Sequence, residues 1–453
     1  MVTVGISTAV IRIITESLAQ NQSQAIIVQM MKKVYRIAIV FSSIITLIFF
    51  QLASFISRGW LKDVRCVAPI QTLVLILPII SISACLKGYF LAKRKVMINA
   101  VSQLVEQMIR MSLIWIFLEY MPTNSFEKMC QIIVVSDMLS EVASCVFLWG
   151  KYRKEKTKKC VEIEKAFSFS YFIQIAFPVT LNKCLSSFLR TVENVLIPNQ
   201  LALFCASREL ALADFGTLKG MALPLIFFPA SFLTAFSTLM VPEVAEEKQL
   251  KNQSRLSRLT KKTFETTLAA GIIIAAIFNE YHEHIASLFY PQSHVAFFLK
   301  KLSFLIPFMY LESAVAGIMQ GLNQQRKVLY YNLLDSCIRI SLIYLVVPHY
   351  GMNGFIIIMY FSNIMTSSLN AYRVLKVSTT KFSWKNWVIK PVLSAIAAIV
   401  MGRLVFGRLI VKSSWITLGM KVLVVCMSYL FLITLYGLCD IKSWLMNTKK
   451  VFH

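Results

Sequence analysis

Residues 106–115 read EQMIRMSLIW, and residues 335–344 read DSCIRISLIY. The two stretches lie 229 residues apart and carry an acid, a base and a serine in identical register. Leucine and isoleucine matches are common in an apolar chain, but three polar matches within two apolar segments are not. The pattern therefore predicts an internal duplication, and such a repeat shapes the interpretation of the whole fold.

Both stretches lie in strongly apolar surroundings. Hydrophobic residues make up 57% of the 453 residues and charged residues only 15%, whereas ordinary globular chains carry roughly 25% charged residues. Because one bilayer span needs about 20 mostly apolar residues, the chain has room for about 13 spans and little else. The composition excludes a set of soluble domains and predicts an all-α, polytopic helical bundle in the cell membrane.

Apolar runs place these spans along the chain. The predicted segments are 2–17, 34–57, 67–91, 99–118, 129–149, 168–198, 203–241, 264–288, 295–320, 328–348, 351–375, 388–411 and 415–440.

Basic residues alternate between the two sides of these segments. Loops after odd-numbered segments, together with the C-terminal tail, hold 26 Lys and Arg residues, and loops after even-numbered segments hold 5. Basic loops lie on the cytoplasmic side, next to anionic lipids. We therefore expect loops 150–167 and 242–263 and the C-terminus in the cytoplasm, and residue 1 outside, without a cytoplasmic leader. The net charge of +25 indicates topology and contact with anionic lipids rather than nucleic-acid binding.

The duplication predicts two lobes of the same orientation, because the two copies are six spans apart. Parallel repeats are a known plan of transporters, which place the substrate path at the interface of the repeats. We expect an N-terminal lobe in residues 1–165, the lobe boundary and the core of the C-terminal lobe in 166–375, and two extra helices with a basic tail in 376–453.

The sequence offers little for catalysis, and no catalytic residue, metal site or cofactor is predicted. No Gly-x-x-x-x-Gly-Lys-Ser/Thr occurs, so a nucleotide-hydrolysing P-loop is not expected. No Cys-x-x-Cys occurs among the ten cysteines, and all five histidines fall in loops or at segment ends. We expect a protein that is not an enzyme.

Ionisable residues inside the apolar segments are the candidate functional groups, because charges at membrane depth are costly and usually face a bundle interior or a wet cavity. Cationic clusters suit a pyrophosphate ligand, and carboxylates suit ion coupling. The substrate-binding candidates are Lys183, Arg190, Glu193, Lys219, Arg110 and Arg339. The ion-coupling candidates are Glu106, Asp137, Glu141 and Asp335.

A structural role for these groups competes with the functional one. Glu106 and Arg110, like Asp335 and Arg339, are four residues apart and share one helix face, so each pair can neutralise itself and only hold helices together. Glu193 lies one turn from Arg190 and can neutralise it in the same way.

Several motifs resemble one family of exporters. GISTA at 5–9 and VSQLVEQ at 101–107 are similar to recurring helices of the stage V sporulation protein B family. The most specific motifs are RTVENVLIP at 190–198 and GTLKGMALP at 216–224. The resemblance extends from about residue 4 to residue 445.

The resemblance implies the multidrug/oligosaccharidyl-lipid/polysaccharide (MOP) exporter superfamily. Its members are two-lobed bundles around a central cavity that opens alternately to each side. This branch is similar to flippases for undecaprenyl-linked sugars, including lipid II, which serve cell-wall, spore-cortex or polysaccharide synthesis. Family members usually carry fourteen helices, and we expect the first of them to be missing from this chain.

Three functions follow as hypotheses. The leading one is the flipping of a lipid-linked oligosaccharide, an undecaprenyl-pyrophosphate sugar, across the cell membrane. The second is a drug or cation antiporter of the same superfamily, in which carboxylates would cycle protons or sodium. The third is a non-transporting membrane partner of cell-wall synthesis proteins.

The predicted topology can be tested by labelling intact cells with a membrane-impermeant thiol reagent. The variant should retain Cys160 and carry Ser293→Cys, with all other cysteines replaced. We expect the residue at 293 to react and Cys160 to be protected, because the basic loop is cytoplasmic. Labelling of Cys160 alone would invert the topology.

Overall fold

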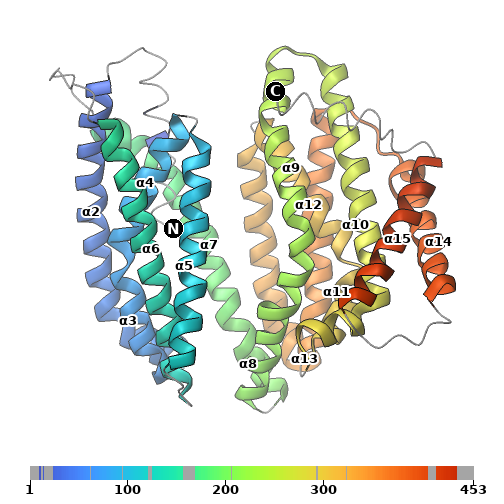
Figure 1. Cartoon of the computed structure of the whole chain (residues 1–453), viewed down its shortest axis with the longest axis horizontal. Helices are drawn as coiled ribbons and strands as arrows, with labels where there is room; N and C mark the ends of the chain where they lie inside the picture. The colour runs from blue at the N-terminus through green and yellow to red at the C-terminus, as the bar shows by residue number, and fades with distance from the viewer. Residues whose placement is uncertain are drawn as a thin grey trace. The chain divides into compact units, whose positions relative to one another are not determined.

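The computed structural model is helical throughout the part of the chain that it describes, and these residues contain no strand (Figure 1). The described residues are 10–11, 14, 24–61, 63–93, 95–120, 125–156, 169–205, 207–291, 294–322, 324–406 and 415–435. The chain divides into two compact units, Met1–Leu189 (unit 1) and Arg190–His453 (unit 2).

The described residues of unit 1 form four long helices and one bent helix pair. Its elements are α2 (Gln24–Phe55), the π-helix η1 (Ile56–Leu61), the 3₁₀-helix η2 (Val64–Cys66), α3 (Val67–Leu75), α4 (Leu77–Ala92), α5 (Val96–Tyr120), α6 (Phe126–Lys156) and the first part of α7 (Phe169–Cys205).

Unit 2 contains the rest of α7 and the remaining described helices. They are α8 (Arg208–Gly216), the π-helix η3 (Thr217–Ala222), α9 (Leu223–Gln249), α10 (Gln253–Phe289), α11 (Val295–Ser303), α12 (Ile306–Gly321), α13 (Gln325–Val377), the π-helix η4 (Lys385–Ile389), α14 (Lys390–Phe406) and α15 (Trp415–Leu435).

The helices are those of a multi-pass membrane protein. Among the described residues, eight helices are long and apolar enough to cross a membrane, or up to ten if each of two bent helix pairs counts as one span. The expected number of thirteen stays a prediction, and most of the first expected segment, 2–17, lies outside the described residues.

α13 consists of two helical segments separated by a break. At 53 residues it would extend ~80 Å if straight, more than twice the thickness of a bilayer core. Gly351 breaks it with φ +57° and ψ −141°, a backbone conformation that glycine adopts without steric cost, and Pro348 lies just before the break. The break falls between the expected segments 328–348 and 351–375.

The duplication is visible in the order of the helices. The starts of three helix pairs are each separated by 229 residues: Gln24 of α2 and Gln253 of α10, Leu77 of α4 and Ile306 of α12, and Val96 of α5 and Gln325 of α13. The bent pairs α3–α4 (41°) and α11–α12 (67°) also recur at this spacing. In each unit the long helix that precedes the bent pair, α2 or α10, packs against that pair. Residues 229 apart are called register counterparts below.

α14 and α15 follow α13 and η4 at the C-terminal end of the described residues. They pack against each other and against α10 (Figure 1). The apolar core of unit 2 extends into this hairpin through Ala395, Ala398, Val425 and Tyr429. The core of unit 1 joins α2, α4 and α6 around Tyr35, Leu86, Phe90 and Leu148.

Two Gly-x-x-x-Gly motifs of unit 2 have different roles. A Cβ on Gly317 would overlap the hydroxyl and main chain of Ser237, and one on Gly321 would lie 2.7 Å from the carbonyl oxygen of Val241. These two glycines allow α12 and α9 to approach closely. A Cβ on Gly216 or Gly220 would meet nothing within 4 Å.

We expect Gly317→Ala to destabilise the folded protein by about 1–3 kcal/mol, because the added methyl group overpacks the crossing of α9 and α12. Gly216→Ala is the matched control and should not destabilise. Thermal unfolding of the two purified variants in detergent measures the difference. Equal midpoints would show that α9 and α12 can separate without loss of stability.

Candidate functional site

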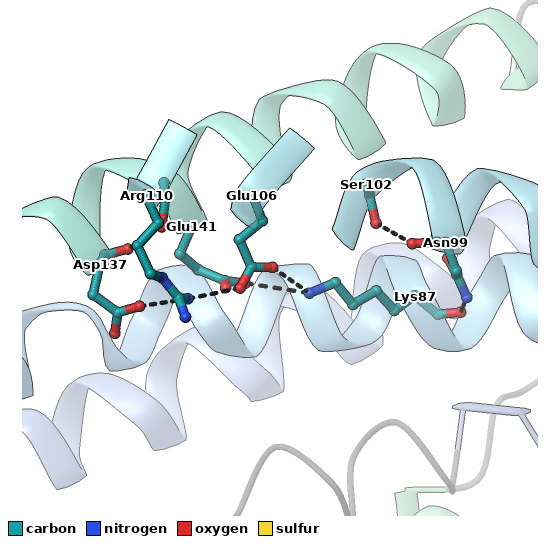
Figure 2. Close-up of polar contacts among 8 residues, drawn as sticks. Lys87, Asn99, Ser102, Glu106, Arg110, Asp137 and Glu141 are labelled. Carbon is teal, nitrogen blue, oxygen red and sulfur yellow. Dashed lines mark hydrogen bonds and ion pairs between the residues drawn. The ribbon is translucent and has the colours of Figure 1, made fainter. Parts of the chain in front are cut away.

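The interior of unit 1 holds a network of ion pairs centred on Lys87 of α4 (Figure 2). The ammonium group of Lys87 lies 3.3 Å from Glu106 Oε2 on α5 and 3.6 Å from Glu141 Oε1 on α6. Glu106 and Glu141 are buried. One cation therefore joins three helices.

Arg110 extends this network along α5. Its guanidinium contacts Glu106 Oε1 at 2.9 Å, one helical turn away, and Asp137 Oδ1 of α6 at 2.5 Å. The five groups form a chain of alternating charge, from Asp137 through Arg110, Glu106 and Lys87 to Glu141 (Figure 2). Three acidic groups face two basic ones, so the chain has one more acid than bases.

The backbone around Lys87 is held as well. Asn99 at the start of α5 donates its Nδ2 to the carbonyl oxygen of Lys87 at 2.8 Å, and Ser102 donates to the carbonyl oxygen of Asn99 at 2.8 Å. The spacing of four residues in Glu106–Arg110 and in Asp137–Glu141 places each pair on one helix face. α5 and α6 pack together along their length, so the two faces meet.

Unit 2 contains a related network. Arg339 of α13 contacts Asp335 at 3.0 Å, one turn away on the same helix, and Glu193 of α7 at 3.3 Å. Ser362 donates to Asp335 Oδ1 at 2.6 Å. The Arg339 Nε and Glu193 Oε1 atoms face each other but lack the geometry of a hydrogen bond. This pair is electrostatic and leaves two buried polar atoms without hydrogen-bond partners.

Two further cations of unit 2 are exposed. Arg190 and Lys219 both present exposed side chains, and Lys219 lies close enough to interact electrostatically with Glu193, Arg339 and Arg190. Lys219 donates to Asn194 Oδ1 of α7 at 2.7 Å. It lies in the π-helix η3, an irregularity frequent at functional sites. Glu312 of α12 interacts electrostatically with Asp335, Arg339 and Arg190.

The two networks share one element and differ in their charges. Arg110 and Arg339 are register counterparts, and each pairs with an acid one turn back and with an acid on a neighbouring helix. The register counterpart of Lys87 in unit 2 is Ala316. At this position, therefore, unit 1 carries a cation that joins three helices, and unit 2 carries an alanine. The duplication preserves the central arginine and varies its surroundings.

The structure brings most of the predicted residues into these two networks. Both predicted pairs spaced by four residues form, and each reaches a second helix. Glu193 forms its ion pair with Arg339, not with Arg190 one turn away. The side chain of Lys183 lies outside the described part of the chain.

Lys87 is the member that sequence reasoning missed. It is a lone lysine in the apolar run 67–91, without an acid three or four residues away on its own helix. Its isolation was itself a signal, since a single cation at membrane depth needs a partner from elsewhere.

Comparisons with known proteins agree with this architecture. No family model matches the chain. The chain is 22% identical over 400 residues to stage V sporulation protein B of Bacillus subtilis (strain 168), a match that covers 85% of this chain and 76% of that protein. It is 18% identical over 309 residues to sporulation protein YkvU of the same organism, covering 66% and 69%.

Solved structures share the fold. The lipid II flippase MurJ in an inward closed conformation gives a TM-score of 0.71 at 12% identity, covering 96% of this chain and 89% of that one. An inward-facing multidrug resistance MATE family transporter of the MOP superfamily gives 0.68 at 13% identity, covering 83% and 87%. The resemblance to the stage V sporulation protein B family is therefore confirmed, and the all-α membrane fold is one that the chain shares with these two structures.

We expect Lys87→Met to destabilise unit 1 by about 3 kcal/mol, because it removes the cationic partner of the buried Glu141 and leaves Glu106 with Arg110 alone. Adding Glu141→Gln should restore part of the loss, since it removes one of these carboxylates. Thermal unfolding of the detergent-solubilised variants measures both effects. Lys151→Met, at an exposed position of α6, is the control. If the double variant were less stable than the single one, Lys87 would not act by balancing Glu141.

Proposed function

We propose that this protein moves a lipid-linked oligosaccharide from the cytoplasmic to the outer leaflet of the cell membrane. The proposal is supported by similarity to stage V sporulation protein B over most of the chain and by a fold shared with a lipid II flippase. Cell-wall, spore-cortex or polysaccharide synthesis would use the product.

The observation that carries the proposal is the pair of exposed cations in unit 2. Arg339 is neutralised by Asp335 and Glu193, whereas Arg190 and Lys219 lie beside this network with exposed side chains. A charged side chain at membrane depth costs about 3 kcal/mol when it faces hydrocarbon. These two groups therefore favour a wet path or an anionic ligand over contact with lipid tails.

A pyrophosphate group fits this pair chemically. Guanidinium and ammonium groups bind phosphate oxygens by charge-assisted hydrogen bonds, and the arginine fork can engage two oxygens at once. The lipid part of such a substrate would stay in hydrocarbon while the two cations compensate the charge of its head group. Without a nucleotide-binding motif in the sequence, the drive would come from the membrane potential, an ion gradient or consumption of the product.

Topology and partners belong to the same proposal. The bias of Lys and Arg residues favours a cytoplasmic C-terminus, and the basic loops would contact anionic lipids on that side. Cell-wall synthesis proteins would be the consumers of the flipped substrate.

A drug or cation antiporter is the second candidate. The acidic surplus of the unit 1 network, three acids against two bases, and a fold shared with a MATE multidrug transporter favour it. Glu106, Asp137, Glu141 and Asp335 would then exchange protons or sodium for a cationic substrate. Extrusion of a fluorescent cationic dye from proteoliposomes, with no flipping of lipid II, would favour this candidate.

We expect Arg190→Ala and Lys219→Ala each to slow flipping of lipid II in proteoliposomes at least about tenfold, because each removes a charge-assisted contact of about 1.5–3 kcal/mol. Arg326→Ala, which removes a cation from an exposed position in the first turn of α13, is the matched control. Arg190→Lys should retain part of the activity, since it keeps the charge and loses the fork.

The double variant Arg190→Ala with Glu193→Ala separates binding from charge balance. If it flips lipid II at the wild-type rate, Arg190 only balances Glu193, and the ligand role is wrong. If it stays inactive while Glu193→Ala alone is active and both fold normally, Arg190 acts on the substrate.

A further inference from the structure

α2 and α10, the long helices that precede the bent pair of each unit, share several apolar residues but are covered differently. Four apolar register counterparts of α2 and α10 are identical: Ile44 and Ile273, Ile45 and Ile274, Ile48 and Ile277, and Phe49 and Phe278. Ile45 and Ile274 are both half-buried. The other three α2 residues are 50%, 49% and 45% exposed, and their α10 counterparts are 7%, 8% and 7% exposed. The sequence of this face is therefore duplicated, but its cover is not.

The hairpin of α14 and α15 accounts for the difference. α2 packs on α3 and α4, as α10 packs on α11 and α12, so the repeated neighbours are the same. α10 additionally contacts α14 and α15. Among the described residues of unit 1, no helix hairpin covers α2 in this way, and the face stays exposed.

The hairpin contacts one ridge of α10, whose members follow one another at intervals of four residues. Trp387 lies in η4, which continues directly into α14, and its Nε1 donates to Glu265 Oε1 at 3.1 Å. The Tyr429 hydroxyl of α15 donates to the carbonyl oxygen of Ala269 at 2.8 Å. A Cβ on Gly402 would lie 3.4 Å from the hydroxyl of Tyr281. Rows of this spacing are the ridges that interdigitate when helices pack.

α2 repeats this ridge with exposed residues. They are Arg36, Val40, Ile44, Ile48 and Leu52, which we call the α2 ridge. All five are exposed, and the four apolar members range from 42% to 55%. A ridge of regularly spaced aliphatic side chains is suited to packing against a helix.

The polar residues near the ends of the two ridges differ in charge and in hydrogen-bonding groups. α10 offers acceptors, because Glu265 binds Trp387 and Glu280 forms two hydrogen bonds with Arg403 of α14. The register counterparts on α2 are Arg36 and Gln51. If a second copy of this chain packed its hairpin on α2, the indole N–H of Trp387 would face Arg36. The guanidinium of Arg36 has only donors and cannot accept this hydrogen bond. A carboxylate is the group that complements Arg36.

We propose that the α2 ridge is a docking surface for a transmembrane helix of another membrane protein, one that carries a carboxylate facing Arg36. Because lipid tails are as apolar as leucine, such an association depends on close packing and polar contacts. The ridge supplies the packing surface, and Arg36 supplies the selectivity. The α2 ridge belongs to unit 1, whereas Arg190 and Lys219 belong to unit 2, so the docking proposal uses none of the residues proposed to bind the substrate.

A defined peptide probe can test this docking surface. The full chain, with a photoreactive phenylalanine analogue in place of Ile48, is reconstituted in phosphatidylcholine vesicles with a Leu/Ala transmembrane peptide. The peptide carries a single Glu one turn inside the end that matches the Gln24 end of α2, or a Lys at that position. We expect the Glu peptide to cross-link up to about fivefold more than the Lys peptide, the upper range of an exposed ion pair.

Charge reversal and position supply the controls. Arg36→Glu should reverse the preference between the two peptides, whereas Arg153→Glu, at an exposed position of α6, should leave it unchanged. The analogue at Leu404, which is 73% exposed on α14, should not distinguish the peptides.

Two results would overturn the proposal. Equal yields from both peptides at Ile48, with or without Arg36→Glu, would show that the ridge only faces lipid. Cross-links between two copies of the chain at Ile48, in vesicles without peptide, would show that a second copy covers it. Flipping measured in the same vesicles should be unaffected by Arg36→Glu, so failure of the docking proposal is distinguishable from failure of the proposed function.

Discussion

Each charged group inside the two helical units needs a partner, and the helix arrangement depends on how this need is met. An acid placed one turn before Arg110 or Arg339 neutralises the arginine locally, but a guanidinium has five donors and one carboxylate cannot satisfy them. In both units the arginine therefore also binds an acid of a neighbouring helix, Asp137 or Glu193. A local pair thereby becomes a contact between helices.

Duplication explains why this solution occurs twice, and divergence explains why the two units differ. The helix starts and the bent helix pair recur at a spacing of about 229 residues, so the scaffold is repeated. The charges around the arginine are not repeated: Lys87 has Ala316 as its counterpart, and Glu312 has Ser83. Backbone geometry and packing constrain the scaffold, whereas a side chain at the edge of a network can change if its partners change with it.

The sequence predicts the contacts that are local and misses those that require tertiary packing. The pairing of Glu106 with Arg110 follows from a spacing of four residues, and the break near Gly351 follows from the end of an apolar run before a glycine. The partners of Lys87 lie on two other helices, and no periodicity within α4 identifies them. The pairing of Glu193 with Arg339 joins residues 146 positions apart in the chain, and the nearer Arg190 was the partner that spacing alone suggested.

The same reasoning applies to the outer faces of the bundle. In water, exposed isoleucine and phenylalanine residues would indicate a missing partner, but on a membrane helix they are ordinary contacts with lipid. Exposure of the α2 ridge is therefore uninformative by itself. It gains meaning from α10, where the same residues at the same register are covered and where two acids hold the covering hairpin. An internal repeat thus allows the exposed face of α2 to be compared with the covered face of α10. The covered copy shows that a face of this sequence can pack against other helices.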